Sequence, residues 1–132
     1  MDTLLVGSEV PRVDGLAKVT GKAVYGDDII MNNMLYGVCR YVDIPAGRID
    51  ALDLSEAEKV PGVVRIATWN DIPGQRKLGA IVPDHPPIID KEIAYRGDVV
   101  AVVAAETYEA ACSAVDKIKI TYTPWEPITS PE

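Results

Sequence analysis

The chain has 132 residues, of which 48% are apolar and 25% are charged. A chain of this size and composition can fold as one domain and bury roughly two-thirds of the surface that its unfolded form exposes. Twenty acidic residues against thirteen basic ones give a net charge of -7, and no cluster of lysines and arginines occurs. This balance argues against a surface for nucleic acid or for anionic membranes.

The sequence shows no sign of a membrane segment or of secretion. Its longest apolar run is far too short to span a bilayer, and Met1-Asp2 opens it without the basic region of a signal peptide. We therefore expect a cytoplasmic protein. Cys39 and Cys112 lack CxxC spacing and are expected to be two reduced, mostly buried thiols.

The N-terminal part is rich in turn signals. Residues 1–11 have little periodicity and are expected to form an extended arm, followed by one domain over residues 12–123 and the start of an interdomain linker at 124–132. Closely spaced Gly and Asp residues predict loop and β structure, without a helix, over residues 12–28, with one short strand at 23–25.

Two strands follow. Residues 34–42 (MLYGVCRYV) are mostly apolar and favour β structure, with a bend or a close backbone approach expected at Gly37. Residues 48–54 alternate between apolar and acidic side chains in a less regular pattern, which predicts a short strand.

A short strand-helix-strand unit is predicted over residues 48–67. Ser55 and Glu58 have capping-box spacing, and Pro61-Gly62 would end the helix after barely two turns. Residues 63–67 then predict the second strand. Residues 69–91 hold several prolines and predict a long loop with one short strand at 80–82; a loop of this length is usually functional or packed against a partner.

The clearest pattern of the chain is a second strand-helix-strand unit. Residues 99–105 form an unbroken apolar run of strand length, expected to be buried on both faces. Thr107 is the expected N-cap of a helix, and residues 119–122 alternate as a half-exposed strand does. The apolar stripe of the helix consists of Ala111, Ala114, Val115 and Ile118. Two such units predict a mixed α/β (α+β) fold with both in one layer.

Two candidate ligand sites in the N-terminal part have simpler interpretations. Residues 15–23 (GLAKVTGKA) approach a phosphate-binding loop, but the spacing is one residue too long and Ala23 replaces the Ser or Thr that binds Mg²⁺. Asp27-Asp28 is more typical of a solvated turn than of a metal site.

The histidine and the cysteines lack the surroundings that catalysis needs. His85, the only histidine, follows Asp84 in a proline-rich loop without a second ligand nearby, so we expect neither a general base nor a zinc site. Cys39 and Cys112 have no neighbouring base in the sequence and are not expected to be nucleophiles.

Single arginines and tryptophans have structural interpretations. Arg12 and Arg96 are candidates for anchoring their loops through backbone hydrogen bonds. Trp69 and Trp125 each follow a strand and are expected to cover a sheet edge, with a partner-facing anchor as the alternative. The residues alone predict no catalytic, cofactor-binding or metal-binding side chain.

An ordered set of short motifs nevertheless resembles one family along the whole chain. The motifs are Arg12-x-Asp14-Gly15-x-x-Lys18-x-x-Gly21-x-Ala23-x-Tyr25-x-Asp27-Asp28, Leu35-Tyr36-Gly37, Arg48-Ile49-x-x-Leu52-Asp53-x-Ser55-x-Ala57, Pro61-Gly62-Val63, Asp71-Ile72-Pro73-Gly74, Tyr95-x-Gly97-x-x-Val100-Ala101-x-Val103-x-Ala105 and residues 110–122. They are similar to the α/β hammerhead domain of the molybdenum hydroxylases, a family that includes xanthine dehydrogenase, aldehyde oxidase and carbon monoxide dehydrogenase. In these enzymes the hammerhead domain is the N-terminal piece of the large subunit, and the large subunit binds molybdopterin.

The resemblance implies an enzyme that hydroxylates a purine, another N-heterocycle or an aldehyde with water as the oxygen source. It implies molybdopterin, iron-sulfur clusters and FAD for the whole enzyme, and none of these bound by this chain, because the catalytic and pterin-binding residues lie in later domains. The implied partners are the other domains of the large subunit, the iron-sulfur domain or subunit and the FAD subunit. The loop at residues 71–91 is expected to face a partner, and the isolated chain could self-associate through an orphaned apolar surface.

One segment departs from the family pattern. Many members have Ser-Pro and then Pro-His-Ala before Arg-Ile, where this chain has residues 40–47 (RYVDIPAG), so the substrate stays open among purines, other N-heterocycles, aldehydes and carbon monoxide. One alternative is a stand-alone carrier module, which would need a Met-flanked lysine at a hairpin tip, unlike Lys18 and Lys22. Another is a small enzyme built on Asp84-His85 and Asp27-Asp28.

Overall fold

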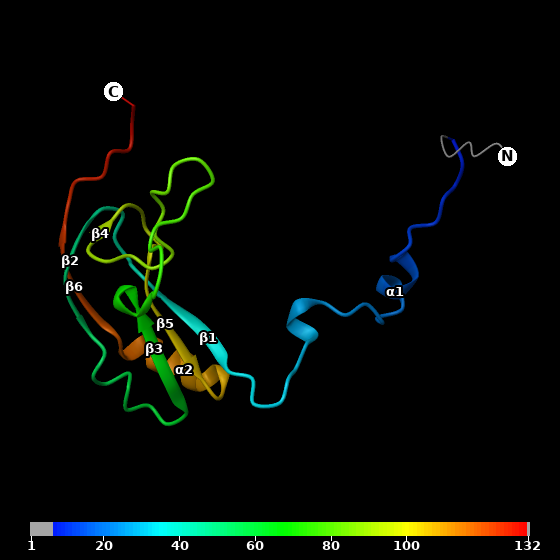
Figure 1. Ribbon diagram of the computed structural model, residues 1–132, viewed down its shortest axis with the longest axis horizontal. Coiled ribbons are helices and arrows are strands. Elements are labelled where there is room, and N and C mark those ends of the chain that lie inside the picture. The colour runs from blue at the N-terminus through cyan, green and yellow to red at the C-terminus, as the bar shows by residue number, and fades with distance from the viewer. Residues whose placement is uncertain (1–6, 132) are drawn as a thin grey trace. The chain divides into compact units, whose positions relative to one another are not determined.

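The structure, a computed structural model, describes residues 7–131. The chain divides into two compact units, one ending at Asn32 and the other beginning at Asn33. The larger unit holds the strands and the core (Figure 1). Among the described residues, no helix is long and apolar enough to cross a membrane.

Two three-stranded antiparallel sheets make up the larger unit. In each sheet the central strand is flanked by strands from distant parts of the sequence. The first sheet has the order β1 (Tyr36–Tyr41), β5 (Val99–Ala105), β3 (Val63–Thr68), and the second has the order β4 (Glu92–Ile93), β2 (Gly47–Asp53), β6 (Lys119–Pro124).

The apolar run at residues 99–105 forms β5, the central strand of the first sheet, as predicted. None of its side chains is exposed, because β1 and β3 pair with its two edges and α2 packs against the sheet. Val103 lies opposite Val38 on one side and Ile66 on the other, so β-branched side chains meet across the sheet.

The predicted helix is confirmed as α2 (Tyr108–Lys117). The hydroxyl of Thr107 accepts a hydrogen bond from the backbone N–H of Ala110 at 3.1 Å, the expected N-cap contact. Ala111 and Ala114 are fully buried, and these small side chains let α2 lie close against β1 and β5 (Figure 1). Val115 is only half-buried, at the margin of the stripe.

The mixed α/β class is confirmed, but the placement of both strand-helix-strand units in one layer is wrong. Each unit contributes its two strands to different sheets, β2 and β3 in one case and β5 and β6 in the other. Side-chain alternation reports which face of a strand is buried and not which strand pairs with it, so the sequence pattern could not distinguish these arrangements.

The predicted helix at Ser55 is also wrong, because residues 55–59 form consecutive turns and residue 60 a bend. The backbone N–H of Ser55 donates to the carboxylate of Asp53 at 3.0 Å, and the N–H of Glu58 donates to the Leu54 carbonyl instead of to a Ser55 cap. Pro61 follows too soon for helix propagation to offset its nucleation. The segment still buries Ala57 and Val60.

Two smaller β-structure predictions are wrong, and one short strand was not predicted. Residues 80–82 are not a strand, since the chain reverses between Leu78 and His85, which pair through an isolated bridge. The two-residue strand β4 gave no pattern long enough to predict. The irregularity of β1 lies between Arg40 and Tyr41 and not at Gly37.

The smaller unit contains two short helices, α1 (Gly15–Val19) and the 3-10 helix η1 (Gly26–Asp28). The expectations of no helix in residues 12–28 and of a strand at 23–25 are therefore wrong. Residues 7–11 have no helix or strand, and the rest of the expected arm, residues 1–6, lies outside the described residues.

Candidate functional site

Asp27 and Asp28 lie in the turn that the sequence favoured over a metal site. The Asp28 carboxylate accepts a hydrogen bond from the backbone N–H of Tyr25 at 2.9 Å, which caps η1. Within residues 7–131, no group of three or more His, Cys, Asp and Glu side chains could hold a metal ion.

His85 serves the loop between β3 and β4. Its ring stacks on Tyr95 with a centroid distance of 6.4 Å, and its backbone exchanges hydrogen bonds of 2.8 and 3.0 Å with Leu78. The side chain is exposed and lines an open hollow of about 240 Å³ beside Asp84 and Tyr95, so the geometry gives it a structural contact and no burial that would tune it as a base.

Both cysteines are free and half-buried, less buried than expected. Each lies near a tyrosine. The charge of Cys39 and a hydrogen bond to it raise the pKa of Tyr41, and a hydrogen bond to Cys112 raises the pKa of Tyr108. These pairs make the tyrosines weaker acids and supply no cation that would activate a thiol.

The loop before β5 is held by Asp98, which sequence reasoning missed, and not by the exposed Arg96. Asp98 is 3% exposed, and its Oδ2 accepts hydrogen bonds from the backbone N–H groups of Ala94 at 2.8 Å and Tyr95 at 3.2 Å. Its carbonyl accepts a 2.9 Å bond from Val42. The signal was an aspartate directly after Gly97 and before a buried strand, a position that favours a side-chain-capped turn.

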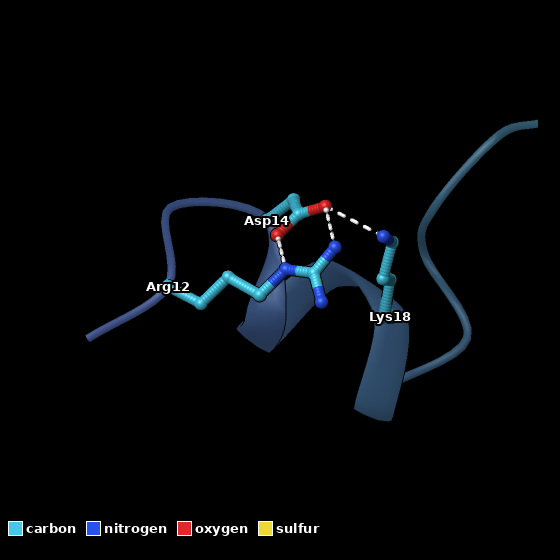
Figure 2. Close-up of polar contacts among 3 residues, drawn as sticks. All are labelled: Arg12, Asp14 and Lys18. Atoms are coloured by element: carbon cyan, nitrogen blue, oxygen red, sulfur yellow. Dashed lines mark hydrogen bonds and ion pairs between the residues drawn. The ribbon is translucent and has the colours of Figure 1, made fainter.

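Arg12 anchors its loop as expected, but through a carboxylate and not through the backbone. It forms an ion pair with Asp14, and Lys18 Nζ lies 2.6 Å from the other oxygen of the same carboxylate (Figure 2). The hydrogen bonds from Lys18 and Arg12 lower the pKa of Asp14 below its usual value. This three-residue cluster, called the Asp14 clamp, spans the start and the end of α1.

A cleft lies beside the long loop that the sequence marked as functional. Trp69 begins the 3-10 helix η2 (Trp69–Asp71) after β3, and the guanidinium of Arg76 lies 5.3 Å from the centre of its ring. The cleft has a volume of about 430 Å³, and a second hollow of about 280 Å³ shares Trp69, Ile89 and Lys91 with it. Besides Lys91, the charged residues that line the larger cleft are Lys77, Asp84, Asp90 and Glu92.

The loop itself ends in an exposed apolar tip. Ile81 is 94% exposed and Val82 is 61% exposed. The turn is tight at Gly79, where an added Cβ would lie 1.8 Å from the Val82 carbonyl oxygen. A tight turn that presents apolar side chains to solvent is typical of a contact surface and not of a catalytic centre.

An arginine beside the core also lacks a full set of partners. The Nε of Arg40 on β1 is buried and has no hydrogen-bond acceptor among residues 7–131. Its terminal nitrogen lies 3.5 Å from Asp43, a weak contact. A buried, unpaired donor is costly, so this guanidinium is suited to an acceptor supplied from outside the chain.

Two small antiparallel sheets, the first of them covered by α2, define a mixed α/β domain. A family model for the aldehyde oxidase and xanthine dehydrogenase α/β hammerhead domain matches residues 20–126. The chain belongs to this family, which is found in the large subunits of the molybdenum hydroxylases. This finding confirms the resemblance seen in the sequence and favours it over a carrier module.

Two relatives that this chain matches are much longer than the chain itself. A probable xanthine dehydrogenase subunit of Bacillus subtilis is 38% identical over 92% of this chain, which spans 16% of that protein. The nicotinate dehydrogenase large molybdopterin subunit of Eubacterium barkeri is 36% identical over 99% of this chain and 31% of that protein. The chain therefore spans about one sixth to one third of these relatives.

Solved structures show the same fold. The aldehyde oxidoreductase from Desulfovibrio desulfuricans matches with a TM-score of 0.89 and 30% identity over 96% of this chain and 15% of that one. The Cu,Mo-CO dehydrogenase matches with a TM-score of 0.88 and 25% identity over 95% of this chain and 16% of that one.

Proposed function

We propose that this chain is the N-terminal structural and docking domain of a molybdenum hydroxylase large subunit. The observation that carries the proposal is the family match over residues 20–126, found in proteins several times longer. The whole enzyme would oxidatively hydroxylate a purine, another N-heterocycle or an aldehyde in the cytoplasm, with water as the oxygen source. Within the chain we assign residues 12–123 to the domain and 124–132 to the start of a linker.

The residues present fit neither an iron-sulfur cluster nor a pterin phosphate. An iron-sulfur cluster takes four cysteine ligands, whereas this sequence has two, placed on β1 and α2. Acidic residues line the Trp69 cleft together with lysines, so it is not the uniformly basic cradle that a pterin phosphate favours. We therefore assign molybdopterin, iron-sulfur clusters and FAD to other parts of the enzyme and derive no chemical step here.

The proposed role is to dock other parts of the enzyme through the loop at residues 71–91. Its exposed tip, Ile81 and Val82, offers apolar area, and the Arg76–Trp69 stack can anchor a partner beside the cleft. The iron-sulfur domain or subunit is the proposed partner of this surface, and the FAD subunit joins the same complex. Backbone amides of residues 71–91 should exchange hydrogen more slowly in the assembled enzyme than in the isolated chain. Equal exchange in both would remove this loop from the interface.

The test of the whole proposal is the native polypeptide purified from its source with an antibody to this domain. A polypeptide, or a stable complex, several times larger than 14.3 kDa that carries molybdenum would support the hydroxylase assignment. A free 14.3 kDa protein without molybdenum would refute it and favour a stand-alone module. In the active enzyme, His85→Ala should leave turnover unchanged, because the ring is exposed and stacks on Tyr95.

A further inference from the structure

The short helix α1 carries an apolar stripe that nothing in its own unit covers. Val13, directly before the Asp14 cap, and Leu16 and Val19 within the helix recur every third residue, and they are 102%, 75% and 83% exposed. Asp14 and Lys18 lie on the other side of the turn, where the Asp14 clamp holds them (Figure 2). The helix is therefore amphipathic, with its apolar side bare.

The exposure continues along the segment. None of residues 7–32 is buried. The large apolar side chains exposed between residues 10 and 31, besides the stripe, are Val10, Val24, Tyr25, Ile29, Ile30 and Met31. A concentration of bare apolar side chains on this scale marks a surface that another part of an assembly covers.

The lengths of the relatives indicate what covers it. The aldehyde oxidoreductase match includes 96% of this chain, hence most of residues 7–32, yet only 15% of that longer chain. The Bacillus relative likewise continues far beyond the matched part. Proteins that contain this segment therefore have a large further body of chain available to bury it. A segment of this size is comparable to one side of a stable interface, about 20–30 residues.

We propose that residues 10–31 form an apolar strap that packs on the molybdopterin-binding remainder of the large subunit. This inference rests on the proposed function and names the surface that joins this domain to the rest of the subunit. The Asp14 clamp joins the start and the end of α1, so it favours the turn that presents the stripe and lowers the ordering needed on binding.

The first experiment identifies what covers the strap. Leu16 is replaced by photoreactive benzoylphenylalanine in the complete enzyme, and the cross-linked peptides are identified by mass spectrometry. Because Leu16 is 75% exposed, this replacement should not disturb the fold. Cross-links to large-subunit sequence outside residues 1–132 support the proposal. Cross-links to residues 33–132, to a second copy of the strap, or to another protein overturn it, as does the absence of any cross-link.

The second experiment measures burial. Val13→Ser, Leu16→Ser and Val19→Ser are combined in the complete enzyme, and amide exchange of residues 7–32 is followed. We expect at least tenfold protection in the unaltered enzyme relative to the isolated chain, and loss of that protection in the triple variant. The control combines Val64→Ser, Tyr108→Ser and Ile128→Ser, which alters exposed apolar residues outside the strap and should leave protection unchanged.

Two results separate this inference from the proposed function. A molybdenum-containing enzyme whose strap exchanges as fast as in the isolated chain overturns the strap alone. A chain without molybdenum and without a larger partner overturns the hydroxylase assignment and the strap with it. Equal loss of protection in the strap and control variants would show general destabilisation and would overturn the specific role of the stripe.

Discussion

Asp98 is expected to contribute about 2 kcal/mol to the stability of the larger unit. Asp98→Ala removes the acceptor of the Ala94 and Tyr95 N–H groups, and a buried donor left unpaired costs about 1–3 kcal/mol. Residues 94 and 95 are themselves exposed, so water can replace part of what is lost, which sets the expectation near the lower end for two bonds. In Asp98→Ala the loop at residues 94–98, directly before β5, should also become more mobile.

The matched variant is Asp98→Asn. Both bonds fall on the single oxygen Oδ2, so an asparagine carbonyl oxygen in the same place can accept both, and the loss should stay below about 1 kcal/mol. Urea unfolding of the chain, with the slope held common, measures both free energies. Equal losses for Ala and Asn would show that the charge and not the acceptor position matters. No loss for Ala would refute the proposed anchoring of the loop.

Three further predictions concern other parts of the larger unit. The pKa of Asp71 is lowered to about 2 by hydrogen bonds from Thr68 and Arg65. The ionised Asp71 carboxylate should therefore stabilise the fold fully above about pH 4, and this stabilisation should disappear between about pH 4 and 2. The urea midpoints of the unaltered chain and of Asp71→Asn should differ at pH 6 and converge as the pH falls from about 4 to 2. Ala114→Asp should cost on the order of 3 kcal/mol in urea unfolding, by placing a charge against the sheet, and exposed Ser113→Asp should cost far less. Gly79→Ala should speed amide exchange at Leu78, because its Cβ cannot fit, while the unfolding midpoint stays nearly unchanged.

The sequence was most informative where one element carries its own periodicity. The run at residues 99–105 and the stripe through Ala111 and Ala114 each identify a buried face, and β5 and α2 formed as expected. At Ser55 the capping-box spacing predicted a helix that does not form, because too few residues lie between Ser55 and Pro61. α1 was missed because closely spaced Gly and Asp residues predicted loops there, and an apolar stripe of three residues is too short to predict a helix; ion pairs at Asp14 support it in the structure.

The candidate surfaces were harder to predict than the fold. The long loop could be marked from its length and prolines alone, yet its cleft depends on Trp69 and Lys91 coming together from its two ends. Asp98 is one acidic residue among twenty, and only three dimensions show that it is buried. A docking surface has no fixed spacing of residues such as a ligand or a catalytic reaction imposes. The sequence therefore held no single strong motif, and the family was identified from an ordered set of weak ones.

The two units of the chain differ in what stabilises them, and this difference suggests an order of assembly. The described core residues all lie between Val42 and Ile118, so the larger unit can fold on its own contacts. None of residues 7–32, which include the strap, is buried. The stabilisation of about 25 cal/mol per Å² of buried apolar surface is therefore gained only when something covers the strap. If the strap proposal holds, the larger unit folds first and the strap becomes protected at a later, separate step. Pulse-labelled hydrogen exchange during refolding of the complete enzyme should show β5 protected before residues 10–31, and simultaneous protection of both would refute this order.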